Sequence, residues 1–124
     1  MGAKSWRRIS DAMTVFASSE ANQKAYLDSF GYKVPIKDDL AEDFSFLVES
    51  LNANGKGRYF AEKQLELISE VSGFFDGKSG DVDPDFWLMG TQSCIDGWDQ
   101  IRSMAKRYQT IDEGGDPDIF EEEA

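Results

Sequence analysis

The sequence contains no histidine and a single cysteine, Cys94. Without histidine, the chain lacks the commonest general base, the usual partner of a serine or cysteine nucleophile, and the commonest neutral metal ligand. One cysteine cannot form an intramolecular disulfide, and small secreted domains usually need several. No cation lies next to Cys94 in the sequence to activate its thiol, so we expect a buried core thiol rather than a nucleophile.

Long apolar runs are also missing. No run approaches the roughly 18 residues that a membrane span requires. The basic residues near the start are not followed by the apolar stretch of a secretory signal. Together with the single cysteine, these features predict a cytoplasmic protein that does not enter a membrane.

Basic residues are scarce, with 13 Lys and Arg against 24 Asp and Glu, which gives a net charge of −11. Nucleic-acid binding and adhesion to anionic lipid both require clusters of Lys and Arg, so the charge disfavours both. Seven of the acids and none of the bases lie from Thr110 onward, which leaves seventeen acids and thirteen bases before it. The sequence therefore predicts a helical domain over residues 1–109 and a disordered acidic tail over residues 110–124.

Apolar residues recur at spacings of three and four, and no segment alternates with a period of two. This pattern predicts an all-α fold, a compact bundle of four to five helices. The expected helices cover residues 4–17, 20–30, 38–51, about 58–75 and 84–109. The fourth has the widest apolar face, so we expect it to be the central and most buried helix. Gly90 and Gly97 predict a break or kink in the last helix.

One loop raises the question of a metal site. Four aspartates surround it: Asp76, Asp81, Asp83 and Asp85. A helix–loop–helix calcium site starting at Asp76 requires glutamate at its twelfth position, where the chain has Trp87. We interpret these acids as helix caps and solvated groups, and the glycine pairs match no phosphate-binding loop. No catalytic residue, metal site or cofactor site is therefore predicted.

The third expected helix carries apolar and acidic residues on opposite faces. Its apolar stripe comprises Leu40, Ala41, Phe44, Leu47, Val48 and Leu51. The opposite face comprises Asp38, Asp39, Glu42, Asp43, Phe46 and Glu49. An aromatic residue surrounded by five carboxylates has the composition of an interaction hot spot that faces a basic partner. The alternative is that another helix or a second subunit covers Phe46.

These features predict a non-catalytic, acidic protein-binding module that inhibits or regulates a basic protein. Its most concrete version is an immunity or antitoxin-type inhibitor of a cationic bacterial toxin such as a nuclease. The chain is similar to such inhibitors in kind only, being small and acidic, and no motif assigns it to a particular family. Ile119 and Phe120 lie among acids in the tail, a pattern typical of segments that become ordered on binding.

Three other classes of function remain as alternatives. A nucleic-acid mimic would use its carboxylates in place of phosphates to occupy a DNA- or RNA-binding protein. A structural or assembly subunit would oligomerise through its aromatic residues, and the sequence leaves the oligomeric state open. An enzyme that relies on carboxylates alone is the last alternative. A mimic would spread its carboxylates in rows, whereas an inhibitor would cluster them around apolar anchors.

Overall fold

The computed structural model describes residues 6–29, 38–78, 82–88 and 90–121. Within these ranges every regular element is helical, which confirms the predicted all-α fold. The five α-helices are α1 (Ile9–Ala17), α2 (Glu20–Asp28), α3 (Asp38–Ala53), α4 (Glu62–Lys78) and α5 (Gln92–Gln109). Two short 3-10 helices, η1 (Lys56–Tyr59) and η2 (Pro84–Trp87), precede α4 and α5.

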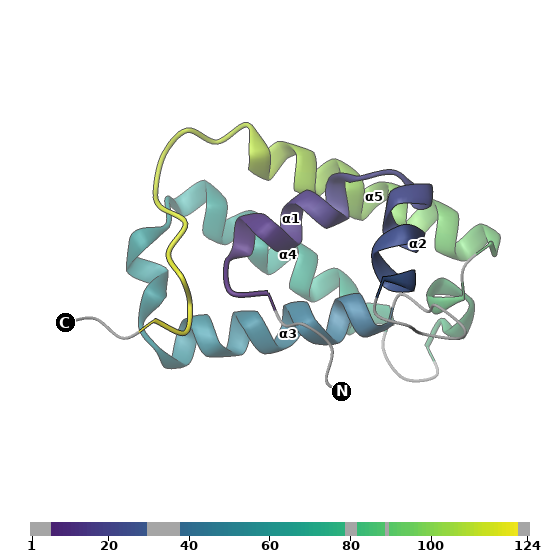
Figure 1. Ribbon diagram of the computed structural model, residues 1–124, viewed down its shortest axis with the longest axis horizontal. Helices are drawn as coiled ribbons and strands as arrows, with labels where there is room; N and C mark the ends of the chain where they lie inside the picture. Colours follow the sequence, from purple (N-terminus) through teal and green to yellow (C-terminus); the bar gives the residue numbers. More distant parts are fainter. Residues whose placement is uncertain (1–5, 30–37, 79–81, 89, 122–124) are drawn as a thin grey trace.

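The three longest helices, α3, α4 and α5, run along the length of the molecule (Figure 1). The shorter α1 packs against α5, α3 and α2, and α2 lies toward one end of the bundle. At the opposite end, the chain after α5 crosses from the end of α5 toward the end of α3 (Figure 1). This crossing segment, residues 110–121, is called the tail segment below.

The core is built around α5, which packs against α1, α4 and η2. Trp98 on α5 is fully buried. Its ring centroid lies 5.8 Å from that of Phe16, 5.4 Å from that of Phe75 and 5.7 Å from that of Phe86. The expectation that the fourth helix is the most buried is therefore wrong, because α5 is the helix enclosed by neighbours on several sides. Its buried residues are Cys94, Gly97, Trp98, Ile101, Met104, Ala105 and Tyr108, against Gln64, Leu67, Ile68, Val71 and Phe75 on α4.

The first helix begins later than its apolar spacing predicts. It starts at Ile9 rather than at residue 4, and Arg8 before it has an extended backbone. Ser5, which by its residue type is the candidate N-cap of the predicted helix, lies outside the described residues. Trp6 is buried in front of the helix, stacked on Tyr26 of α2 at 6.1 Å and edge-on to Phe16 of α1. Trp6 thus contributes to the core from an extended segment, which a helical period cannot distinguish from one more turn.

The predicted break in the last helix occurs at Gly90. This residue has a left-handed backbone, with φ of 93°, and separates η2 from α5. The Thr91 hydroxyl then caps α5 by accepting a hydrogen bond from the backbone N–H of Cys94. Gly97 does not break the helix, and glycine is required there because a Cβ would overlap the ring of Phe86. The expectation of a buried Cys94 is confirmed.

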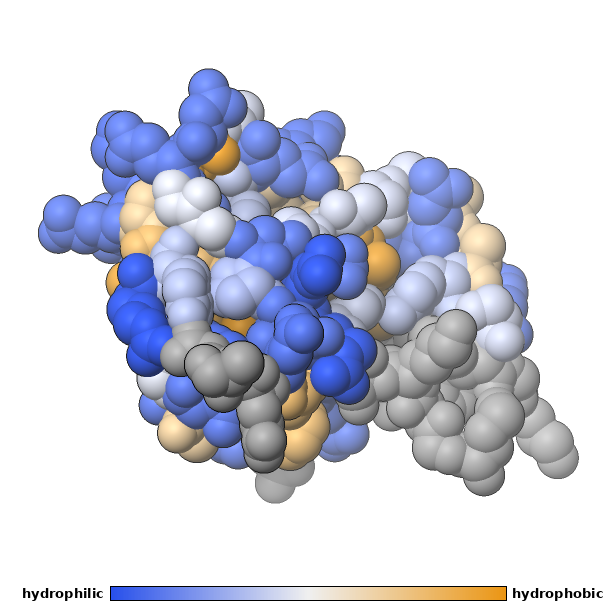
Figure 2. Space-filling view, turned by 60° about the vertical axis from the view of Figure 1, so that its left-hand side comes forward, coloured by the Kyte–Doolittle hydropathy of each residue, from blue (hydrophilic) through white to orange (hydrophobic). Residues whose placement is uncertain are grey.

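Hydrophilic side chains cover most of the end of the molecule on which the tail segment lies, with apolar ones between them (Figure 2). None of the helices in the described part of the chain combines the length and the apolar character needed to cross a membrane. The fold thus leaves two acidic features side by side at this end, the second half of α3 and the tail segment.

Candidate protein-binding surface

Helix α3 presents Phe46 to solvent, with 52% of its surface exposed. Glu42 lies four residues before Phe46 and Glu49 three residues after it, so the three share one face of the helix, and both glutamates are exposed. The apolar stripe faces the other way, and Phe44 and Leu47 are fully buried in the core. The spacing in the sequence therefore predicts correctly which face of α3 is free of the core.

The other three predicted residues contribute less to this face. Asp43 is half-buried, because its position on the helix borders the apolar stripe. Asp38 and Asp39 form the first turn of α3, but their side chains lie outside the described part of the structure. The structure thus places Glu42, Phe46 and Glu49 together as exposed residues of one face, with Asp43 half-buried at the edge of that face.

The tail segment supplies a second aromatic residue that the predicted site did not include. The ring of Phe120 stacks on that of Phe46, with centroids 5.6 Å apart and 22° between the ring planes. The guanidinium carbon of Arg7 also lies over the Phe120 ring, 5.6 Å from its centroid, in a cation–π contact. Glu121 follows and is exposed. We call Glu42, Phe46, Glu49, Phe120 and Glu121 the acidic-aromatic surface.

Phe120 is held in place by its neighbour Ile119, whose side chain is fully buried. The backbone N–H of Ile119 donates to the carbonyl of Arg7 at 2.8 Å, and its carbonyl accepts from the Asn54 side chain at 2.8 Å. Burial of an isoleucine stabilises by about 1.5–3 kcal/mol relative to leaving it exposed. The tail segment is therefore anchored at one apolar residue whose backbone polar groups are both satisfied.

Two aspartates of the tail segment also have partners. Asp118 accepts a hydrogen bond from Nε of Arg7 at 2.7 Å, and this bond, helped by the charge of Arg7, holds the pKa of Asp118 below its usual value. Asp116 accepts from both the backbone N–H and the hydroxyl of Ser10 in the first turn of α1. A carboxylate at this position also interacts favourably with the helix dipole.

Over residues 110–121 the tail segment therefore has defined contacts with the rest of the domain, and its predicted disorder is unconfirmed. The segment escapes the expected repulsion among its acids because one carboxylate meets Arg7 and another meets the start of α1. The remaining predicted tail residues, 122–124, lie outside the described ones. The signal in the sequence that could have identified this packing is the Ile119–Phe120 pair, because two adjacent large apolar side chains favour burial over solvation.

Asp83, one of the aspartates around residue 80, has a structural explanation. Asp83 accepts hydrogen bonds from the Ser93 hydroxyl at 2.6 Å and from Lys78 at 3.2 Å, and these bonds lower its pKa. Asp81 lies outside the described residues. In the described part of the chain, no three Asp, Glu or Cys side chains are grouped as a metal ion would require.

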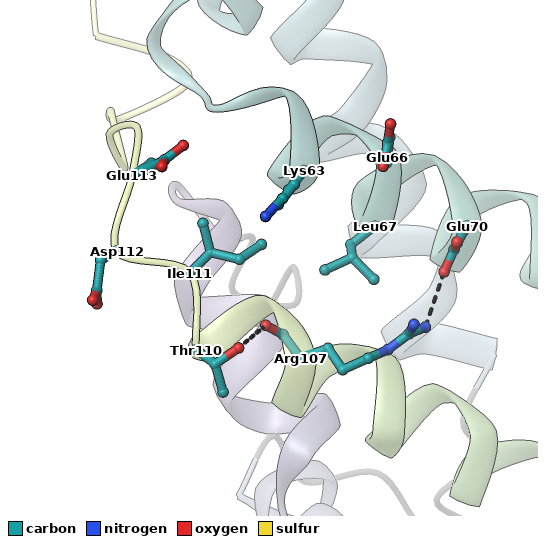
Figure 3. A pocket seen from close by; sticks show the side chains of 9 residues that line it. All are labelled: Lys63, Glu66, Leu67, Glu70, Arg107, Thr110, Ile111, Asp112 and Glu113. Atoms are coloured by element: carbon teal, nitrogen blue, oxygen red, sulfur yellow. Dashed lines mark hydrogen bonds and ion pairs between the residues drawn. The ribbon is translucent and has the colours of Figure 1, made fainter.

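A shallow groove lies between α4, α5 and the start of the tail segment. Figure 3 shows Leu67 and Ile111 turned toward each other at its centre. On its rim, Arg107 pairs with Glu70 at 3.1 Å, and Lys63 points into the groove (Figure 3). Because this rim carries both signs of charge, it offers a charged ligand little net attraction, and the acidic-aromatic surface remains the stronger candidate.

Comparison of the chain with protein-family models, with curated proteins and with solved structures gives no match.

Proposed function

We propose that this protein binds a basic protein partner through the acidic-aromatic surface. The observation that carries the proposal is the stacked pair of Phe46 and Phe120, which stays half open to solvent on the Phe46 side. Large aromatic rings at the centre of an interface contribute much of its binding energy when they are surrounded by groups that exclude water. Glu42, Glu49 and Glu121 supply such a rim.

The charge of the chain favours a basic partner. A net charge of −11 attracts a cationic protein over long range and raises the rate of encounter. Lysine and arginine side chains of the partner would then meet the glutamates around the ring pair.

The way in which the ring pair is held also supports binding. Phe120 follows a fully buried residue and stacks on a helix residue, so both rings occupy defined positions before any partner arrives. Side chains that are ordered in advance lose less conformational entropy on association. Carboxylates clustered around an aromatic pair also favour a protein-binding module over a nucleic-acid mimic, which would need carboxylates in rows.

The narrower version of this proposal is that the basic partner is a cationic toxin, such as a nuclease, and that binding inhibits it. A surface of this type could cover a basic active site without any catalytic residue of its own. The same experiment tests both versions, because it identifies the bound protein before measuring the contribution of each side chain.

The test uses the full chain as bait in a lysate of its native host, followed by affinity measurement with the purified partner. We expect a protein of high isoelectric point to bind, and Phe46→Ala to weaken it by about 2 kcal/mol or more, which is roughly 30-fold in Kd. Glu42→Lys should chiefly slow association and reduce its dependence on salt. A cationic nuclease among the bound proteins should lose activity in the complex.

Ile95→Ala is the matched control, because Ile95 is another exposed apolar residue, 38% exposed, on α5. It should leave affinity unchanged. Equal affinities for Phe46→Ala and the wild type would contradict the proposal, as would a loss of equal size in Ile95→Ala. Thermal melting of each variant separates a loss of binding from a loss of fold.

A further inference from the structure

A second pocket lies beneath the first half of the tail segment, and none of its described lining residues belongs to α3. The chain leaves α5, arches outward and returns to η1, where the backbone N–H of Gly115 donates to the carbonyl of Tyr59 (Figure 1). The space under the arch measures about 370 Å³. Its walls include Ser10 of α1, Gln64 of α4 and Tyr108 of α5.

The lining of this pocket is acidic. Asp112, Glu113 and Asp116 all contribute to it, and none of its described lining residues is a lysine or an arginine. Carboxylates gathered around a concave surface focus a negative potential into it. The pocket should therefore attract a cation and repel an anion.

Tyr108 supplies a second, independent feature at the same place. Its side chain is 4% exposed, and its hydroxyl is buried with no hydrogen-bond partner among the described residues. Burial, with a smaller contribution from the charge of Asp116, raises the pKa of this hydroxyl. Buried hydroxyls are nearly always hydrogen-bonded, because leaving one unpaired costs about 1–3 kcal/mol. An unpaired hydroxyl close to a carboxylate indicates that a ligand group belongs between them.

We propose that this pocket binds a primary alkylammonium group. An ammonium carries three N–H donors and no acceptor, which suits a pocket whose charged groups are carboxylates and whose hydroxyl can accept.

The arrangement favours an ammonium over a guanidinium. Both carboxylate oxygens of Asp116 already accept from Ser10, one from its N–H and the other from its hydroxyl. A guanidinium binds a carboxylate best through two parallel hydrogen bonds, and both oxygens of Asp116 already share their lone pairs with Ser10, whereas an ammonium needs only single acceptors. A divalent metal ion is disfavoured too, because the described carboxylates are not grouped as ligands around one point.

Two sources share this chemistry, a lysine side chain on another protein and a free diamine. The experiment titrates the full chain, at constant ionic strength, with 1,4-diaminobutane and with a blocked tripeptide that has lysine at its centre. Tetramethylammonium serves as a cation without N–H donors. We expect saturable 1:1 binding of at least one amine, at least 10-fold tighter than tetramethylammonium, and shifts of the amide resonances of residues 112–116.

Tighter binding of the peptide would identify a lysine side chain as the ligand, and tighter binding of the diamine would identify a small amine. Equal affinity for tetramethylammonium would overturn the proposal, because charge alone would then explain the attraction. Absence of saturable binding by both amines would overturn it as well.

Variants of the protein separate the hydroxyl from the charge. Tyr108→Phe removes only the unpaired hydroxyl, so it should weaken amine binding at least 5-fold while its melting temperature stays equal or rises. The double variant Asp112→Asn, Glu113→Gln should weaken binding at least 10-fold.

A matched double variant, Asp85→Asn with Asp96→Asn, removes the same charge from η2 and from the start of α5. Asp96 lies twelve residues before Tyr108 on α5, or about 18 Å along a helix. This control should bind amines as the wild type does. Unchanged affinity in Tyr108→Phe, or equal losses in the two double variants, would overturn the proposal.

Discussion

Trp98 and Ile119 are both fully buried, yet different kinds of contact surround them. Trp98 lies among three aromatic rings contributed by α1, α4 and η2, with centroids between 5.4 and 5.8 Å from its own. Ile119 is the one fully buried apolar side chain of the tail segment, whose other fixed points are the stack of Phe120 on Phe46 and several polar contacts. These include an ion pair with Arg7 and hydrogen bonds to Asn54 and Ser10.

This difference implies two levels of stability. Removing a contact around Trp98 loosens helices that pack on one another, so it should lower the free energy of unfolding of the whole domain. Removing a contact of the tail segment should release that segment alone, because local opening needs only the free energy of its own few contacts. Substitutions in the central core and in the tail segment should separate these two levels of stability.

Gly97→Ala should produce the largest decrease in the free energy of unfolding. A Cβ at this position would overlap the ring of Phe86 in the centre of the core, and overpacking of this kind costs about 1–3 kcal/mol. Alanine is otherwise the better helix former by about 1 kcal/mol, so helix propensity alone predicts the opposite sign. Chemical denaturation followed by circular dichroism would measure the change.

Gly73→Ala is the matched control for that variant. Gly73 is exposed in the middle of α4, and a Cβ there would meet nothing within 4 Å. We expect the free energy of unfolding to rise by up to about 1 kcal/mol, because alanine has the higher helix propensity and lowers the conformational entropy of the unfolded chain. Two glycine variants that both stabilise the protein would show that the core around Phe86 is looser than the structure indicates.

Ile119→Ala should lower the stability of the protein by a smaller amount, about 1–2 kcal/mol. A buried isoleucine truncated to alanine usually costs 2–5 kcal/mol, but here the loss cannot exceed the free energy with which the tail segment docks. Hydrogen exchange at the backbone N–H of residue 119, which donates to Arg7, should accelerate, while exchange in α5 stays unchanged. Accelerated exchange throughout α5 would join the two regions into one cooperative unit.

The helices with a clear apolar face, such as α3 and α5, could be predicted from the sequence because each has its own apolar period. The break at Gly90 followed from the glycine itself, since the position adopts a φ of 93°. Which helix occupies the centre could not be predicted, because that depends on how many neighbours enclose a helix rather than on its own pattern. The apolar face of α4 is wide, yet α5 lies between α1 and α4 and contributes Trp98 to the core.

The candidate surface could be predicted in part. The orientation of Phe46 followed from the period of α3, whereas its contact with Phe120 joins residues 74 positions apart in the sequence. The charge of the tail favoured disorder, and no pattern in the sequence indicated that Arg7 would lie next to Asp118. The pocket beneath the tail segment could not be predicted either, because its walls come from α1, α4, α5 and the tail segment, and α1 and α4 are far from the tail segment in the sequence.

The smallest expected effect concerns the acid sensitivity of the tail segment. The hydrogen bond from Arg7 lowers the pKa of Asp118, so the folded tail favours the charged carboxylate more than the unfolded chain does. The contribution of Asp118 to docking is therefore complete above its unfolded pKa of about 3.9 and is lost as the pH falls through its lower folded pKa. Between pH 6 and 2, the ring resonances of Phe120 should move toward their unstacked positions.

Asp118→Asn should reproduce part of that movement at neutral pH, because an amide cannot form the ion pair with Arg7. It should also remove most of the acid-dependent movement below pH 4. Asp83→Asn is the control: the pKa of Asp83 is lowered as well, by Ser93 and Lys78, but its partners lie on α4 and α5. Its loss should disturb η2 and leave the Phe120 resonances as they are. If the tail resonances of Asp118→Asn kept the full acid transition of the wild type, another carboxylate would control docking, and Asp116 at Ser10 would be the next to replace.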